Sequence, residues 1–140
     1  MVIPSILLVD DEELDVELVE RSFRKHKLMN PIVHAPNGAD ALRILRGESR
    51  DLTLPKPYIV LLDINMPRMN GLEFLAELRS DPSIAMSVVF MLTTSDRPQD
   101  REEAYACHVA GYILKQNCGR DFINAIRLIE NYQMLVVLPE

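Results

Sequence analysis

The stretch that decides the fold class is Tyr58–Gly71, with the sequence YIVLLDINMPRMNG. Its first five residues form an apolar run rich in β-branched side chains, which is typical of a strand buried on both faces of a sheet. The run ends on the carboxylate of Asp63, and a loop that contains Pro67 and Gly71 follows. In open α/β folds, ligands bind at the carboxyl edge of the parallel sheet. Asp63 is therefore expected at a functional edge.

The same arrangement occurs near the amino terminus, where the apolar run Ile6–Val9 ends on Asp10 and Asp11. Three carboxylates that share one edge of a sheet repel one another. The sequence therefore predicts that a cation lies among them.

Length and composition indicate one domain. A chain of 140 residues with 48% hydrophobic and 26% charged residues can bury a substantial core and is not disordered as a whole. The net charge of −6, without a basic stripe, argues against binding to nucleic acid.

The chain also lacks the usual signs of a membrane or secreted protein. The longest apolar runs have the length of a strand, and residues 1–4 lack the basic and apolar regions of a signal peptide. Cys107 and Cys118 do not form a CxxC motif, so two reduced thiols are predicted rather than a disulfide or a zinc site. We expect a soluble cytoplasmic domain.

Segments of strand and helix character alternate along the chain. The expected strands are 6–9, 31–35, 58–62, 87–92 and 111–115, and the expected helices are 12–27, 37–47 with Asn37 as N-cap and Gly47 as stop, 71–80, 98–108 and 121–132. Five such pairs predict a doubly wound, five-stranded parallel sheet with helices on both faces. The domain is expected to span residues 1–132, with residues 133–140 as an apolar C-terminal extension and no separate output domain.

Polar side chains end four of the five predicted strands. They are Asp10 and Asp11 on the first, Asp63 on the third, Thr93 on the fourth and Lys115 on the fifth. If these four strands are neighbours, the side chains meet in one site. Carboxylates form a hard oxygen site that suits Mg²⁺, and Asp63 is a candidate nucleophile that would form an acyl phosphate. Lys115 and Thr93 could then contact the phosphoryl oxygens.

The residues at these strand ends resemble the receiver domain of two-component response regulators. The resemblance rests on four motifs in the expected order, Asp10-Asp11, Asp63-Ile64-Asn65-Met66-Pro67 with Gly71, Leu92-Thr93-Thr94-Ser95 and Gly111-Tyr112-Ile113-Leu114-Lys115, and it covers roughly residues 5–132. It implies a flavodoxin-like (βα)5 fold and a phosphoprotein that takes a phosphoryl group from a histidine kinase in a phosphorelay. It also implies autophosphorylation from small donors and autodephosphorylation rather than an enzyme activity on other molecules.

The resemblance further implies a role for each site residue. Asp63 would be the phospho-acceptor and a ligand of Mg²⁺ or Mn²⁺. The other metal ligands would be Asp11, the backbone carbonyl of Asn65 and, through a water molecule, Asp10.

Two more residues, Lys115 and Thr93, would contact the phosphoryl group, and Tyr112 would move into the space that Thr93 leaves. Lys115 is similar to the lysine of the family, Thr93 to its switch hydroxyl and Tyr112 to its switch aromatic residue. The sequence departs from the family at Gln116, because a proline usually follows the lysine and the bond between them is often cis. A cis bond before a residue other than proline costs about 2.5–4 kcal/mol, so we expect the Lys115–Gln116 bond to be trans.

The sequence is also similar to stand-alone regulators that are paired with phytochrome-type histidine kinases. The features that carry this similarity are the long loop Glu48–Pro57, the run Leu92–Ser95 and the tail Ile129–Glu140. The implied partner is a sensor histidine kinase of the bacteriophytochrome type.

The tail contains an apolar, β-favouring run, Met134–Leu138, which would be an aggregation hazard if it were exposed. Two interpretations remain open. The tail could fold back on its own domain, or it could form an arm that docks on a second copy and builds a homodimer, together with the helix 98–108 and the strand 111–115.

Simpler explanations exist for single residues. Asp11 could cap the helix that follows it, and Lys115 could be a solvated strand end. Two other functions are alternatives, a phosphorylation-independent dimeric interaction module and an aspartyl-phosphate phosphatase. The phosphatase would need an acid two residues after its nucleophile, and Asn65 stands at that position.

Overall fold

The structure, a computed structural model, describes residues 3–139. Residues 1–2 of the predicted domain 1–132 and residue 140 of the predicted extension 133–140 lie outside the described residues. No helix in the described part of the chain combines the length and the apolar character that crossing a membrane requires.

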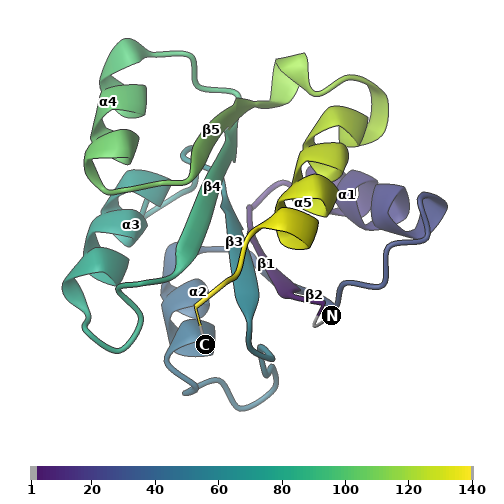
Figure 1. Cartoon of the computed structure of the whole chain (residues 1–140). Coiled ribbons are helices and arrows are strands. Elements are labelled where there is room, and N and C mark those ends of the chain that lie inside the picture. The colour runs from purple at the N-terminus through teal and green to yellow at the C-terminus, as the bar shows by residue number, and fades with distance from the viewer. Residues whose placement is uncertain (1–2, 140) are drawn as a thin grey trace.

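The core of the fold is one parallel sheet of five strands in the order β2-β1-β3-β4-β5 (Figure 1). The strands are β1 (Ser5–Val9), β2 (Ile32–Ala35), β3 (Tyr58–Leu62), β4 (Val88–Thr93) and β5 (Gly111–Leu114). This order confirms the predicted doubly wound fold and makes β1, β3, β4 and β5 neighbours. Val9 pairs with Leu62 in the register of the sheet, so the residues that follow them, Asp10 and Asp63, leave the sheet side by side.

Five α-helices cover the two faces of the sheet. They are α1 (Glu13–Lys25), α2 (Gly38–Leu45), α3 (Gly71–Ser80), α4 (Pro98–Ala106) and α5 (Ile123–Leu135). Helices α1 and α5 cover one face, and α2, α3 and α4 cover the other (Figure 1). Side chains of β3 alternate between the two cores, with Val60 and Leu62 on the α2–α4 side and Ile59 and Leu61 on the α1–α5 side. This alternation explains why the central strands are apolar throughout.

The local signals for helix starts are largely confirmed. The Asn37 side chain accepts a hydrogen bond from the backbone N–H of Asp40 at the start of α2. Helix α1 begins one residue later than predicted, and its N-cap residue, Glu12, makes no side-chain capping bond. The interpretation of Asp11 as a helix cap is therefore wrong.

The connection from β5 to α5 differs from the prediction. Lys115–Asn117 and Arg120–Phe122 form two short 3-10 turns, and α5 begins at Ile123 rather than at residue 121. Asp121 and Phe122 adopt left-handed backbone conformations with φ of 56° and 57°, which an α-helix does not accommodate. This turn carries Phe122 into the core. The Lys115–Gln116 bond is trans as predicted, since the one cis bond among residues 3–139 precedes Pro57.

The tail forms no β-strand in the described residues. Helix α5 continues to Leu135, so the first three residues of the predicted extension are helical. Leu138 then packs against the α1–α5 core, and in Figure 1 the chain after α5 runs back across the domain. Within one chain, the tail therefore folds back on its own domain. Leu135 and Val137 nevertheless remain 84% and 96% exposed.

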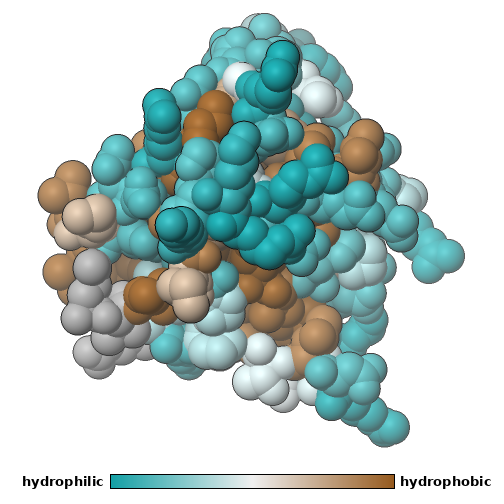
Figure 2. Space-filling view, turned by 90° about the vertical axis from the view of Figure 1, so that its right-hand side faces the viewer, coloured by the Kyte–Doolittle hydropathy of each residue, from teal (hydrophilic) through white to brown (hydrophobic). Residues whose placement is uncertain are grey.

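The surface over α1 and α5 is mostly hydrophilic, with hydrophobic patches between the polar areas (Figure 2).

Candidate functional site

Three carboxylates meet at the carboxyl edge of the sheet. Asp10, Asp11 and Asp63 each offer one oxygen atom, and these atoms all lie within 4.8 Å of one another. Asp10 and Asp63 are buried, whereas Asp11 is exposed. The structure thus brings together the three acids that the sequence singled out.

The backbone holds one oxygen of each buried carboxylate. The N–H of Glu12 donates to Asp10 Oδ1 at 2.9 Å, and the N–H of Ile64 donates to Asp63 Oδ1 at 2.8 Å. The N–H of Asp63 itself continues the sheet ladder to the carbonyl of Val9 at 2.9 Å. These bonds orient both carboxylates and leave their Oδ2 atoms facing the site.

Lys115 provides a cation at the place where the sequence predicts one. Its side chain is only 6% exposed, and its Nζ lies 2.9 Å from Asp10 Oδ2 and 3.1 Å from Asp63 Oδ2. A third carboxylate, Asp15 on α1, lies 2.7 Å from the same nitrogen. The interpretation of Lys115 as a solvated strand end is therefore wrong.

The site carries an excess of negative charge. Asp10, Asp11, Asp15 and Asp63 supply four carboxylates and Lys115 supplies one ammonium group, which leaves three negative charges uncompensated. Burial raises the pKa of the Asp10 carboxyl, and the hydrogen bond from Lys115 only partly opposes this effect. Burial alone would lower the pKa of Lys115, but the hydrogen bonds to Asp15 and Asp10 outweigh it, and the pKa is raised. The raised pKa of Asp10 thus follows from its burial, and the raised pKa of Lys115 follows from its carboxylate partners.

The donor set fits a hard divalent cation. Among residues 3–139, the Asp11 side chain takes part in no hydrogen bond or ion pair, so its oxygen atoms are available. Carboxylate oxygens are the ligands that Mg²⁺ and Mn²⁺ prefer, and no histidine or cysteine belongs to this cluster. Asn65 lies two residues after Asp63, in the β3–α3 loop, and is exposed.

Asp15 is the site residue that the sequence analysis missed. It lies in the first turn of α1, four residues after Asp11. The helices that follow the strands begin at the carboxyl edge of the sheet. An acidic residue in the first turn of the first helix could therefore have been predicted to lie at the site.

The two predicted switch residues meet at Ser95 in the loop after β4. Thr93 Oγ1 is buried and accepts the backbone N–H of Ser95 at 3.2 Å. The Tyr112 hydroxyl donates to the carbonyl oxygen of Ser95 at 2.8 Å, and burial raises the pKa of this hydroxyl. The Ser95 side chain in turn donates to the buried carboxylate of Asp100 on α4. One loop residue thus connects the end of β4 to Tyr112 and to α4.

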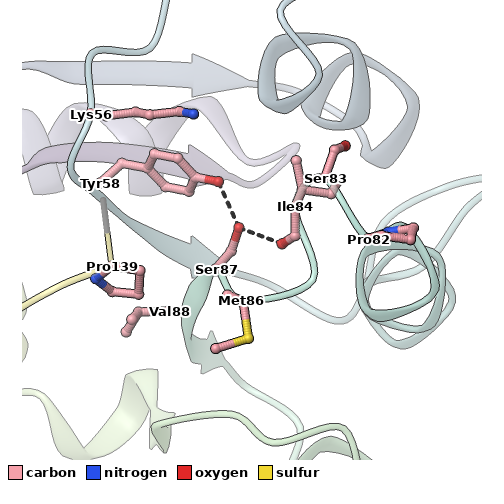
Figure 3. A pocket seen from close by; sticks show the side chains of 9 residues that line it. All are labelled: Lys56, Tyr58, Pro82, Ser83, Ile84, Met86, Ser87, Val88 and Pro139. Carbon is pink, nitrogen blue, oxygen red and sulfur yellow. Dashed lines mark hydrogen bonds between the residues drawn. The ribbon is translucent and has the colours of Figure 1, made fainter.

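A separate pocket of about 160 Å³ lies at the opposite edge of the sheet, at the amino ends of β3 and β4 (Figure 3). Tyr58 and Ser87 are joined there by a 2.6 Å hydrogen bond between their hydroxyls, and Ser87 donates to the carbonyl of Ile84 at 2.8 Å. Pro139 of the tail also lines this pocket. The acidic cluster takes no part in it.

Comparison with known proteins supports the resemblance to the receiver domain of response regulators. Residues 6–127 match the model of the response regulator receiver domain. Response regulator Rcp1 of Synechocystis sp. is 30% identical over 135 residues, which cover 96% of this chain and 92% of that protein.

Two solved structures share the whole architecture. The Mn²⁺-bound form of Rcp1 has a TM-score of 0.84 at 30% identity and covers 98% of this chain and 99% of its own. The phosphorylated cyanobacterial phytochrome response regulator RcpA has a TM-score of 0.81 at 27% identity and covers 99% of this chain and 100% of its own. The motifs, the fold and the matched residues together show that this chain belongs to the response regulator receiver domain family.

Proposed function

We propose that this chain is a response regulator that accepts a phosphoryl group on Asp63 from a histidine kinase, in a Mg²⁺-dependent reaction of a phytochrome-type light-signalling pathway. The observation that carries the proposal is the position of the Asp63 carboxylate, which lies between the acids of β1 and the ammonium of Lys115. The pathway assignment is supported by the likeness to RcpA, which is a phytochrome response regulator.

The chemistry is a transfer between two nucleophiles. An oxygen of the Asp63 carboxylate attacks phosphorus, the new O–P bond forms, and the N–P bond of the kinase phosphohistidine breaks. The imidazole leaves with the electron pair of that bond. Small acyl or amido phosphates can replace the kinase as donor, and water reverses the modification by hydrolysis of the acyl phosphate.

Four groups would hold the metal ion, namely Asp11, Asp63, the backbone carbonyl of Asn65 and, through water, Asp10. Mg²⁺, when bound, supplies positive charge that offsets the charge on the phosphoryl oxygens. The excess negative charge and the available oxygen atoms of Asp11 support this assignment.

The remaining side chains recognise the product. Lys115 donates to a phosphoryl oxygen from its position beside Asp63 Oδ2, and Thr93 donates its hydroxyl proton to another. Thr93 must then give up its contact with the N–H of Ser95, which disturbs the loop that also holds Tyr112. The switch therefore works by moving the Ser95 loop, α4 and the Tyr112 ring.

The test of this function is a labelling experiment. Wild type, Asp63→Asn and a control variant, Asp51→Asn, are incubated with Mg²⁺ and either a phosphorylated histidine kinase or acetyl phosphate. Asp51 is exposed in the loop before β3, so its loss should leave labelling unchanged. Wild type and Asp51→Asn should form an acid-stable, base-labile acyl phosphate, and Asp63→Asn should not. Equal labelling of all three proteins would disprove the assignment.

We also infer a homodimer that uses α4, β5 and the 133–140 arm. Its support is the exposure of apolar side chains at the end of α5 and beyond, where Met134 is 61%, Leu135 84% and Val137 96% exposed. Tyr105 on α4 is also half exposed, at 49%. Surfaces of this kind commonly mark contacts between chains.

Mass measurement by light scattering tests the dimer. The double variant Leu135→Glu, Val137→Glu should be monomeric, whereas the control Leu52→Glu should remain dimeric, because Leu52 is an exposed apolar residue of the loop before β3. A monomeric wild type, or an unchanged dimer in the double variant, would refute this arrangement. A dimer that persists while Asp63 is never labelled would favour a phosphorylation-independent interaction module.

A further inference from the structure

The ammonium group of Lys115 uses all three of its N–H donors on carboxylates from three different elements. Asp10 follows β1, Asp63 follows β3, and Asp15 belongs to α1. An ammonium group has only three donors, so the group is saturated. Its direction is therefore fixed by these three partners together.

The three partners differ in what else they can do. Asp10 and Asp63 belong to the cluster of oxygens that could hold a metal ion, whereas Asp15 does not. In the proposed reaction, Asp63 would also bond to phosphorus, and both Asp10 and Asp63 would help to hold the metal ion, so their bonds to Lys115 would change. Asp15 has no such second task.

The Asp15 contact also has the properties of an anchor. It is the shortest of the three, at 2.7 Å, and the Asp15 side chain is 24% exposed, against 3% for Asp10 and 6% for Asp63. Asp15 therefore retains access to water, and its charge is less costly to maintain than that of the buried acids. It lies 100 positions from Lys115 in the sequence, so the bond ties α1 to the segment that follows β5.

We propose that Asp15 is a positioning residue, which anchors the Lys115 ammonium to α1 so that the other two N–H donors stay directed at Asp10 and Asp63. This inference rests on the proposed function for its effect on phosphorylation, but the anchoring itself is a property of the protein without metal ion or phosphoryl donor. When the bond to Asp63 Oδ2 is exchanged for a bond to a phosphoryl oxygen, the ammonium group does not need to be repositioned.

The matched variants are Asp15→Asn and Glu13→Gln. Asp15→Asn keeps the size of the side chain and an acceptor oxygen but removes the negative charge. Glu13→Gln removes the same charge from the same turn of α1, but Glu13 is exposed and, among residues 3–139, forms no ion pair. A difference between the two variants therefore reports the contact with Lys115 rather than the general field of α1.

The first measurement is the NMR signal of the Lys115 ammonium group in protein free of Mg²⁺ and phosphoryl donor. The signal is identified by its loss in Lys115→Arg. The protons of a buried ammonium group that is held by hydrogen bonds exchange slowly with water. The signal should therefore be present in wild type and Glu13→Gln, and it should be lost or strongly broadened in Asp15→Asn. Asp15→Glu, which restores the charge, should recover part of it. A signal in Asp15→Asn as sharp as in wild type would overturn the proposal.

The second measurement is the initial rate of phosphorylation by acetyl phosphate with Mg²⁺. The initial rate should be about tenfold lower for Asp15→Asn than for Glu13→Gln. A tenfold change in rate is the size of effect expected from the loss of one hydrogen bond between charged groups. Equal rates for these two variants would also overturn the proposal. If wild type is not phosphorylated at all, the proposed function fails, and the NMR comparison still decides whether Asp15 anchors Lys115.

Discussion

Gly71 packs directly on the main chain of Asp63. A Cβ atom at Gly71 would lie 2.1 Å from the Asp63 carbonyl oxygen and 2.9 Å from its carbonyl carbon. The N–H of Gly71 also donates to the carbonyl of Ile64 at 2.8 Å and closes the loop between β3 and α3. The absence of a side chain at Gly71 therefore lets the loop return close to the proposed phospho-acceptor.

Gly71→Ala is expected to destabilise the protein by about 3 kcal/mol, because the atoms that would clash belong to the backbone and cannot turn away. The measurement is chemical denaturation followed by circular dichroism. Gly111→Ala is the control, since its Cβ would meet the ring of Phe90 at 3.1 Å, and a ring can shift. Equal losses of stability for the two variants would contradict the role given to Gly71.

Lys115→Met should destabilise the protein by about 3 kcal/mol in the absence of divalent cations, because it leaves buried carboxylates without their cation. The same change should make Mg²⁺ bind more tightly, since the acids lose the positive charge that competes with the metal ion. Melting temperatures with and without Mg²⁺ measure both effects. The control Lys25→Met, at an exposed site, should respond to Mg²⁺ as wild type does. A smaller Mg²⁺ response in Lys115→Met than in wild type would contradict this account of the site.

Tyr112→Phe should cost about 1 kcal/mol of stability, because it removes the hydrogen bond to the Ser95 carbonyl without changing the ring. Urea denaturation measures the loss. Tyr105→Phe, at a half-exposed tyrosine for which no hydrogen bond is found among residues 3–139, should have almost no effect. If both variants matched wild type, the Tyr112 hydroxyl would not hold the loop after β4.

Asp81 should contribute to stability in a pH-dependent way. The Ser83 side chain, Arg46 and the Ser83 backbone N–H bond to its carboxylate and lower its pKa from 3.8 to about 2. A lowered pKa in the folded state means that the contribution is present above the ordinary value of 3.8 and is lost as the pH falls toward 2. The difference in melting temperature between wild type and Asp81→Asn should therefore shrink between about pH 4 and about pH 2.

Asp51→Asn serves as the control for this series, because Asp51 is exposed and, among residues 3–139, has no ion-pair partner. Its difference from wild type should stay small at every pH. A difference between wild type and Asp81→Asn that did not change with pH would show that the lowered pKa contributes nothing to folding.

The sequence alone was sufficient for the sheet and for most of the acidic site. Buried parallel strands such as Tyr58–Leu62 are apolar throughout, and the first polar residue after each run marks the carboxyl edge. Asp10, Asp11, Asp63 and Lys115 could therefore be assigned to one place before any contact was known. Asn37 likewise marked the start of α2, because capping is a local interaction.

The tertiary structure alone decided the features that depend on contacts between distant segments. Asp15 reaches Lys115 across 100 positions, and no local pattern encodes that pairing. The left-handed turn at Asp121 and Phe122 coincides with the burial of Phe122 in the α1–α5 core, and the tail passes where Leu138 contacts the same core. Local preferences and periodicity thus determined the strands and what ends them, whereas packing determined which partner each side chain found.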